Sequence, residues 1–192
     1  MENVYFLMLV TLALLAIVDI VVGVSNDAIN FLNSAIGSKV LSFRTIMIVS
    51  SIGIFIGAVY SSGMMEVARK GIFNPGEFYF DEIMMIFMAV IMTDILLLDF
   101  FNTLGLPTST TVSIVFNLLG AAIVMSLIKI AENNESVSDL VNYINTEKAT
   151  MIIAGILLSV LIAFSIGVIV QWISRLIFSF QYKKKLKSFG FV

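Results

Sequence analysis

Four hydroxyl side chains in a row, placed directly after a proline, are the first candidates for chemistry in this sequence. The segment 105–111 reads GLPTSTT and interrupts an uncharged run from about Phe100 to Ile128. Hydroxyls at membrane depth are costly unless something uses them. Proline suits the first turn of a helix, and the first amides of a helix lack internal acceptors. The segment therefore predicts a helix start that can bind an anion without lysine or arginine. The candidate ligands are Ser109, Thr110 and Thr111; the alternative is that these hydroxyls only cap the helix and bond back to its carbonyls.

Asn26, Asp27 and Asn30 form the second candidate group. They follow the first apolar segment and predict a break in it. On a helix, Asp27 and Asn30 would share a face. Carboxylate and amide oxygens suit a hard cation such as sodium, and the carboxylate alone suits a proton. Two interrupted apolar segments are typical of a transporter core. The alternative is a solvated loop just beyond the membrane, in which Asn26 or Asp27 caps a helix.

The composition places these residues in a membrane protein. Of 192 residues, 59% are hydrophobic and 12% are charged, and the mean hydropathy is +1.06, far outside the range of a soluble domain. Because one span takes about 20 apolar residues, the chain has room for about five helices with short loops. We therefore expect an all-α integral membrane protein with about five transmembrane helices, some broken or re-entrant, forming a single transmembrane domain over residues 1–192.

The expected spans alternate with polar connections. The first connection covers about 25–43, a polar loop covers 131–147, and a basic tail covers 175–192. Because segments rich in Lys and Arg stay in the cytoplasm, we expect a cytoplasmic tail and an N-terminus outside. The spans are expected at about Val4–Val24, Arg44–Met65, Ile83–Thr103, Pro107–Ile130 and Lys148–Ser174.

Further acidic residues lie in or near the spans. Asp94, inside the third span, is a candidate to bind a proton or cation, or to pair with a buried polar group. Asp99 is expected nearer the membrane edge. Glu66, together with Arg69 and Lys70, predicts either a neutralised cluster at a helix end or an interfacial segment.

Several classes of protein have no support in the sequence. The chain contains no histidine and no cysteine, which removes the commonest general base and every thiol metal site. It has no glycine-rich nucleotide-binding pattern and no basic aromatic patch. We therefore expect neither an enzyme nor a nucleic-acid-binding protein, and no cofactor other than a sodium ion or proton as coupling ion.

Three segments resemble signatures of the PiT inorganic phosphate transporters, in the order and spacing of that family. Residues 26–30 (NDAIN) with 37–39 (GSK) resemble the signature GANDVANAFGTSVGSK. Residues 105–111 are similar to GLPVSTTH, and residues 66–72 (EVARKGI) are similar to E-x-x-x-K-G-I. The resemblance spans about 19–123.

The resemblance implies a secondary active transporter that imports inorganic phosphate by symport with sodium or protons. It would be a multi-pass protein of the plasma membrane or inner membrane. Asp27, Asn26 and Asn30 would lie in the sodium and substrate region. Phosphate would meet Ser109, Thr110 and Thr111, and Glu66, like Asp94, would be associated with transport. The alternatives are a permease for another oxyanion such as sulfate, or a non-transporting membrane scaffold.

The sequence departs from the family pattern in residue identity and in length. Ser25 stands for an alanine, Asn33 for a glycine, and Val112 for the histidine after the hydroxyls. The change at Val112 excludes a histidine-dependent proton role. Members of the family carry two inverted repeats and usually dimerise, whereas this chain has one copy of each signature. An odd number of spans suits one inverted repeat. We therefore expect one half of an inverted-repeat transporter, with a second inverted repeat and a homodimer as partners.

Overall fold

The chain consists almost wholly of helices. The computed structural model describes residues 2–39, 41–60 and 71–180. The chain forms two units, Met1–Ala149 and Thr150–Val192. In order, the elements are α1 (Glu2–Ser38), α2 (Phe43–Val59), the 3-10 turn η1 (Pro75–Glu77), α4 (Phe80–Leu104), α5 (Thr110–Asn133), the 3-10 turn η2 (Val137–Asp139), α6 (Leu140–Tyr143) and α7 (Thr146–Phe178).

The expected all-α membrane architecture is confirmed. Within the described ranges, α1, α4, α5 and α7 are long and apolar enough to cross a membrane, and α2 is a shorter apolar helix of 17 residues. The same ranges contain no strand, only an isolated bridge between Phe73 and Ile144. The expected third and fifth spans match α4 and α7 to within a few residues.

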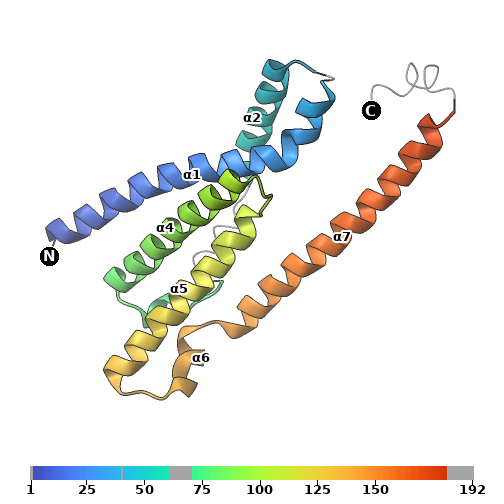
Figure 1. The fold of residues 1–192 in the computed structure, drawn as a ribbon. Helices are drawn as coiled ribbons and strands as arrows, with labels where there is room; N and C mark the ends of the chain where they lie inside the picture. Colours follow the sequence, from blue (N-terminus) through green and yellow to red (C-terminus); the bar gives the residue numbers. More distant parts are fainter. Residues whose placement is uncertain (1, 40, 61–70, 181–192) are drawn as a thin grey trace. The chain divides into compact units, whose positions relative to one another are not determined.

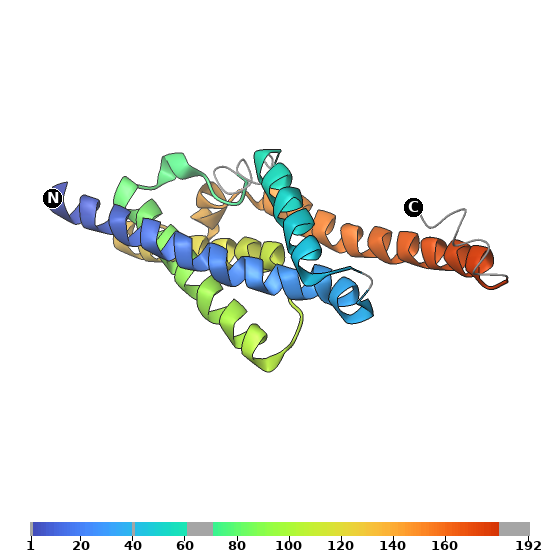
Figure 2. The ribbon, with the colours of Figure 1, turned by 90° about the horizontal axis from the view of Figure 1, so that it is seen from above.

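Helix α4 is the centre of the first unit, where it packs against α1 on one side and α5 on the other (Figure 1). α1 and α4 run in the same direction. The rings of Tyr5 and Phe80 meet at 5.9 Å near the starts of the two helices. Asn26 and Asn102 form a hydrogen bond near the other end of their contact. Seen from above, α1 crosses α4 rather than lying along its whole length (Figure 2).

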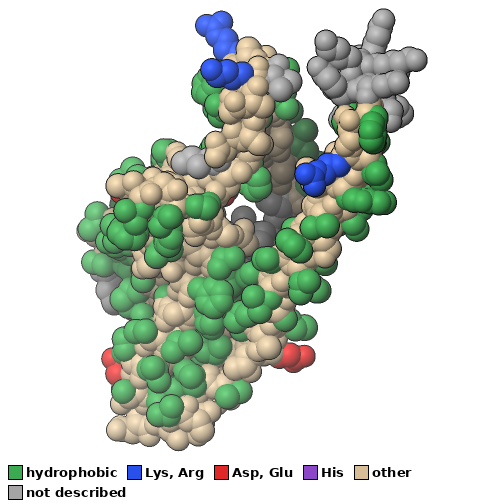
Figure 3. Space-filling view, turned by 45° about the vertical axis from the view of Figure 1, so that its right-hand side comes forward, with side chains coloured by type: hydrophobic (Ala, Val, Ile, Leu, Met, Phe, Trp, Pro, Cys, Tyr) green, Lys and Arg blue, Asp and Glu red, His purple; other side chains and the backbone are tan. Residues whose placement is uncertain are grey.

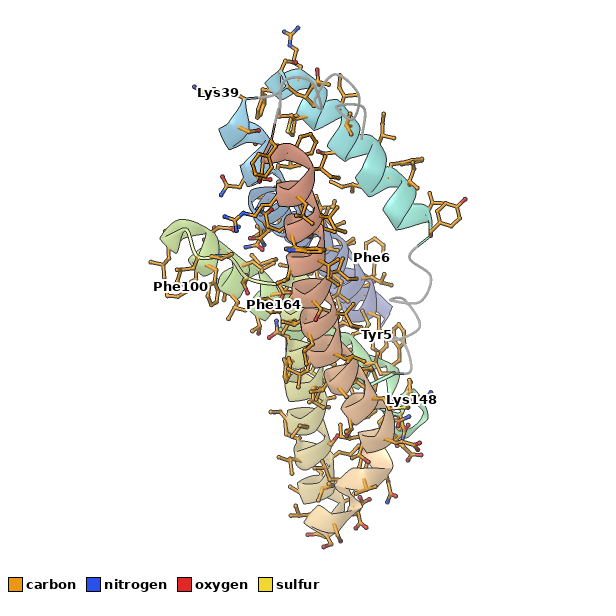
Figure 4. All side chains as sticks on the ribbon, turned by 90° about the vertical axis from the view of Figure 1, so that its right-hand side faces the viewer. Tyr5, Phe6, Lys39, Phe100, Lys148 and Phe164 are labelled. Atoms are coloured by element: carbon orange, nitrogen blue, oxygen red, sulfur yellow. The ribbon has the colours of Figure 1, made fainter. Side chains whose placement is uncertain are left out.

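The interior of this unit is small, and much of its apolar surface faces outward. Ile86 and Leu98 of α4 are buried with Leu118 and Ala122 of α5. Phe100 of α4 is 60% exposed and lies on the outer side of its helix (Figure 4). Hydrophobic side chains cover most of the face drawn in Figure 3, with few charged groups among them. Such a surface is stable against lipid or another protein rather than against water.

A tight turn joins α4 to α5. Gly105 has φ +67°, in the left-handed region. Its amide donates to the carbonyl of Asn102 and the Leu106 amide donates to that of Phe101, at 3.1 and 3.0 Å. These two bonds form a Schellman motif, which satisfies the last carbonyls of α4. Ser109 then caps α5, because its hydroxyl accepts from the Val112 amide at 3.4 Å. The break predicted at this place is therefore confirmed.

The far ends of α4 and α5 are also held together. Lys129 of α5 binds the Glu82 carboxylate of α4 at 2.8 Å, and both side chains are largely shielded from solvent. The Lys129 ammonium also lies 4.3 Å from the centre of the Tyr79 ring. The orientation of α5 against α4 is thus fixed at the end away from the turn.

Two details of the expected helix boundaries are wrong. The predicted break at Asn26-Asp27 is instead continuous helix, because α1 extends to Ser38, and most of the polar connection expected over 25–43 belongs to this helix. Asparagine is only a mild helix breaker, and here its side chain finds partners on other helices. Pro107 does not lie in the first turn of α5 either, since the helix begins at Thr110, after the Ser109 cap.

Some sequence predictions lie outside the described residues. Glu66, Arg69 and Lys70 belong to 61–70, and most of the basic tail belongs to 181–192. The start of the expected 131–147 loop is helical, since α5 continues to Asn133.

The left-handed turn at Gly105 gives a first prediction. Changing Gly105 to Ala should lower the free energy of unfolding by about 1–2 kcal/mol, because a Cβ is strained at positive φ. Nothing else lies within 4 Å of the added Cβ, so the backbone alone causes the loss. The measurement is the unfolding midpoint of the chain in detergent micelles.

Gly120→Ala is the matched control for this variant. Gly120 lies within α5 and a Cβ there would also meet nothing within 4 Å. Alanine should therefore be neutral, or stabilising by about 0.5–1 kcal/mol. Equal effects of the two variants would contradict the role given to the turn.

Candidate functional site

The two polar segments singled out in the sequence lie in contact in the structure. They are separated by about 80 residues in the chain, yet three hydrogen bonds join the middle of α1 to the α4–α5 turn. The Asn26 amide donates to the Asn102 side chain at 2.8 Å, and the Asn30 amide donates to the Thr108 carbonyl at 2.8 Å. The Thr110 hydroxyl donates to Asp27 Oδ1 at 2.7 Å. We call these residues the α1–turn cluster.

Asn26 is the most deeply placed member of the cluster. Only 2% of its surface is exposed. Its amide nitrogen binds Asn102, and its carbonyl oxygen accepts from Asn30 one turn later, at 3.2 Å. A buried amide needs both kinds of partner, and here it has them. Asn26 therefore positions the cluster, and its own polar atoms are occupied.

Asp27 keeps one carboxylate oxygen for other partners. Its Oδ1 accepts from Thr110, while its Oδ2 has no partner among the residues that the structure describes. The side chain is half-buried, and neighbouring Asn30 is exposed. Carboxylate, amide and carbonyl oxygens in one place match the ligand preference of a hard cation. In the described part of the chain, no group of three or more His, Cys, Asp or Glu side chains is suited to a metal ion.

The start of α5 supplies donors for an anion. The amides of Thr110 and Thr111 make no hydrogen bond to any described residue, as expected for the first turn of a helix. The Ser109 hydroxyl caps the helix, and both Ser109 and Thr111 have exposed side chains. Ser109 therefore follows the capping alternative, while the amides of Thr110 and Thr111 and the exposed Thr111 hydroxyl have no partner among the described residues.

Asp94 lies apart from this cluster. It is on α4, two turns before Asn102, and is 1% exposed. Its Oδ1 accepts from the Ser113 hydroxyl and from the Asn117 amide of α5, the latter at 3.1 Å. Asp99 of the same helix is exposed. Of the described acidic residues predicted to be functional, only Asp27 therefore joins the α1–turn cluster.

Sequence reasoning missed several residues of these polar contacts. Asn102, the partner of Asn26, is not among the site residues predicted from the sequence. Asn117 and Ser113 on α5 were not singled out, although an amide inside an apolar span is itself a signal that a buried partner exists.

Comparison with known proteins decides the family. The family model described as "Phosphate transporter family" matches residues 23–192. The chain belongs to this family. The match covers both the α1 segment and the α4–α5 turn, so the α1–turn cluster lies within the matched residues.

Curated relatives carry similar names and are much longer. Three relatives are named "Putative phosphate permease". The Mb2302 protein of Mycobacterium bovis is 31% identical over 106 residues, covering 54% of this chain and 19% of the relative. PF1020 of Pyrococcus furiosus is 28% identical over 123 residues, covering 62% and 30%. TK2061 of Thermococcus kodakarensis is 30% identical over 103 residues, covering 52% and 25%.

The chain spans less than a third of the length of these relatives. No solved structure is significantly similar to it.

The Asn26–Asn102 contact gives a second prediction. Asn102→Ala should destabilise the chain by about 1–3 kcal/mol, because it leaves the buried Asn26 amide without an acceptor. The unfolding midpoint in detergent measures this. Asn133→Ala is the control, because Asn133 is exposed and its side chain bonds to nearby Glu135 and Tyr143 rather than to a buried group of another long helix; its effect should stay within about 0.5 kcal/mol. A similar loss from both variants would mean that the contact across the helices contributes nothing special.

Proposed function

We propose that this chain is part of a secondary active transporter that imports inorganic phosphate together with sodium ions or protons. The observation that carries the proposal is the α1–turn cluster. In this cluster the Asp27 carboxylate, which has one unpaired oxygen, lies beside the start of α5, where the amides of Thr110 and Thr111 are unpaired. The chain that holds the cluster is a member of the phosphate transporter family. A cation and an anion could therefore be held side by side.

Phosphate is the proposed ligand at the start of α5. The amides of Thr110 and Thr111 and the hydroxyls of Ser109 and Thr111 would take its oxygens. The dipole of α5 also favours negative charge at this end. No lysine or arginine is bonded to the cluster within the described ranges, so the charge of phosphate must be offset by something else.

The coupling cation is the proposed source of that offset. A phosphate anion beside the Asp27 carboxylate would place like charges together in a low dielectric, which is strongly unfavourable. A sodium ion held by Asp27, with the side-chain oxygen of Asn30, would relieve this repulsion; a proton on Asp27 would act in the same sense. Neither ion alone is favoured by the sequence, and the gradient of whichever ion is used would drive the cycle without covalent chemistry.

A second inverted repeat is the proposed partner for the open side of the cluster. Ser109, Thr111 and Asn30 are exposed, and the turn between α4 and α5 is irregular backbone. Polar groups and irregular backbone at membrane depth must be covered by protein or line a water-filled cavity. A second repeat, in the same polypeptide or in a second copy, would supply that cover. We further infer a multi-pass protein of the plasma membrane or inner membrane that acts as a homodimer.

Asp27→Asn gives the third prediction. It should abolish phosphate uptake, because asparagine keeps the bond from Thr110 but loses the charge that holds the cation. Asp99→Asn, an equal change at an exposed site on α4, should leave uptake unchanged. Labelled phosphate uptake is measured in proteoliposomes holding the 192-residue chain. It is also measured in cells expressing the longest reading frame that contains the chain. Both systems are tested with and without a sodium gradient.

The gradient that drives uptake, of sodium or of pH, identifies the coupling ion in this assay. Sodium-dependent uptake names sodium, and uptake driven by a pH gradient alone names the proton. Full uptake by Asp27→Asn would contradict the cation role of the carboxylate.

Thr111→Val gives the fourth prediction, aimed at the anion. It removes one exposed hydroxyl and keeps the helix start, so the KM for phosphate should rise by roughly 10-fold or more, the loss of one hydrogen bond to a charged group. Thr103→Val is the control, since Thr103 is exposed in the last turn of α4 and outside the cluster. An unchanged KM for Thr111→Val would remove its hydroxyl from the proposed site.

Two other functions predict different results in the same assays. A permease for another oxyanion would show labelled phosphate displaced by sulfate at similar concentrations. A membrane scaffold would show no uptake and no thermal stabilisation by phosphate, since a ligand stabilises only a protein that binds it.

A further inference from the structure

A pair of carboxyl groups lies inside the bundle, apart from the α1–turn cluster. Asp94 of α4 is 1% exposed, and Asp19 of α1 is half-buried. The two carboxyl groups are within hydrogen-bonding reach of each other. Both lie within helices that are long and apolar enough to span the membrane.

Each carboxyl group has one buried oxygen without an ordinary partner. Asp94 Oδ1 accepts from Ser113 and Asn117 of α5, but Asp94 Oδ2 and Asp19 Oδ1 are buried and have no hydrogen-bond donor. Buried polar atoms in native structures are nearly always satisfied. The two unsatisfied oxygens, on adjoining carboxyl groups, therefore need a hydrogen-bond donor between them.

The surroundings of the pair contain no compensating charge. Three helices meet here. The two carboxyl groups lie on α1 and α4, and the groups of α5 that face them are the neutral side chains of Ser113 and Asn117. No lysine or arginine of the described chain pairs with either carboxyl group. Two ionised carboxylates this close, in a medium of low dielectric, would repel strongly.

We propose that Asp19 and Asp94 bind one proton between them, and so form a proton site within the membrane-spanning bundle. The pair then carries one negative charge instead of two. Oδ1 of Asp94 remains the acceptor for Ser113 and Asn117, and the shared proton satisfies the two buried oxygens that lack a donor, Asp94 Oδ2 and Asp19 Oδ1. Carboxyl pairs that share a proton in this way titrate as a unit.

A metal ion fits the same place poorly. Hard cations are held by several oxygen ligands. Here two buried oxygens lack a donor, Asp94 Oδ2 and Asp19 Oδ1, and the nearby Asn117 amide and Ser113 hydroxyl donate to Asp94. A proton needs only the two oxygens.

The pair is linked physically to the proposed transport site. Gly23 follows Asp19 by one turn, and a Cβ on it would lie 3.3 Å from the Thr110 side chain. Leu98 follows Asp94 by one turn and lies against the same glycine. Release of the proton would place two negative charges between α1 and α4, next to the close packing that carries the Asp27–Thr110 bond. This coupling to transport rests on the proposed function; the proton site itself does not.

Infrared spectra of the full chain in lipid nanodiscs, recorded without phosphate from acidic to alkaline pH, test the site directly. The wild type should show the carbonyl band of a protonated carboxyl group at neutral pH, and lose it at alkaline pH. The band should be missing in Asp19→Asn, in Asp94→Asn and in the double variant, and retained in Asp99→Asn. In each single variant the new amide donates to the remaining carboxylate in place of the proton, so the fold should be kept.

Thermal unfolding of the same samples gives a second readout. We expect the folded chain to bind this proton more tightly than the unfolded chain does. The bound proton then stabilises the folded chain at low pH, and this stabilisation is lost as the pH rises and the proton is released. The unfolding midpoint of the wild type should therefore fall on going to alkaline pH by more than that of Asp94→Asn. Equal pH dependence of the two proteins, absence of the band in the wild type, or its survival in the double variant would overturn the proposal. Loss of the band on adding sodium at constant pH would overturn it in favour of a metal ion.

Uptake measurements separate this inference from the proposed function. If the chain transports phosphate, Asp94→Asn should remove the pH dependence of uptake, while Asp27→Asn removes uptake and keeps the infrared band. Unchanged pH dependence in Asp94→Asn would overturn the coupling role. Absence of all uptake, with the infrared band present and lost in the double variant, would leave the proton site established and the transport function refuted.

Discussion

The structure of the first unit depends on one constraint: a break between two helices at membrane depth frees backbone groups that lipid cannot satisfy. The α4–α5 turn contains such a break. Its own Schellman motif satisfies the end of α4, and Ser109 caps one amide of α5. The Thr108 carbonyl is left over, and it is Asn30 of α1 that donates to it. Helix α1 must therefore pack where the turn is.

The same constraint accounts for where the free polar groups are. Asn26 is buried and saturated, so it serves packing. The groups left open are the first amides of α5, the exposed hydroxyl of Thr111 and the second oxygen of Asp27. Thr111 is exposed and Asp27 is half-buried. The proposed site for two ions of opposite charge would thus consist of the polar groups that this packing leaves without a partner.

Much of this could be predicted from the sequence, because hydropathy and turn chemistry are local properties. The spans corresponding to α4 and α7, the break at Gly105 and the capping role of Ser109 all follow from nearby residues. The continuity of α1 through Asn26 and Asp27 could not be predicted, because it depends on partners about 80 residues away. For the same reason the sequence does not predict that Asn26 pairs with Asn102 or that Asp19 pairs with Asp94. Each residue reads as an isolated polar group in an apolar segment until α1 and α4 are known to run side by side in the same direction.

The two buried or half-buried aspartates of α1 and α4 differ in a way that separates their roles. Asp27 has one hydroxyl donor, a spare oxygen and an exposed amide nearby, so a cation can reach it and gain further oxygen ligands. Asp94 is buried, already accepts two hydrogen bonds, and adjoins a second carboxyl group, with one oxygen of each left buried without a donor. The first environment suits the coupling ion proposed for transport, and the second suits the proposed proton shared between two carboxyl groups. Because the two sites are joined through the close contact of Gly23 with Thr110, a change of charge at one alters the packing that supports the other.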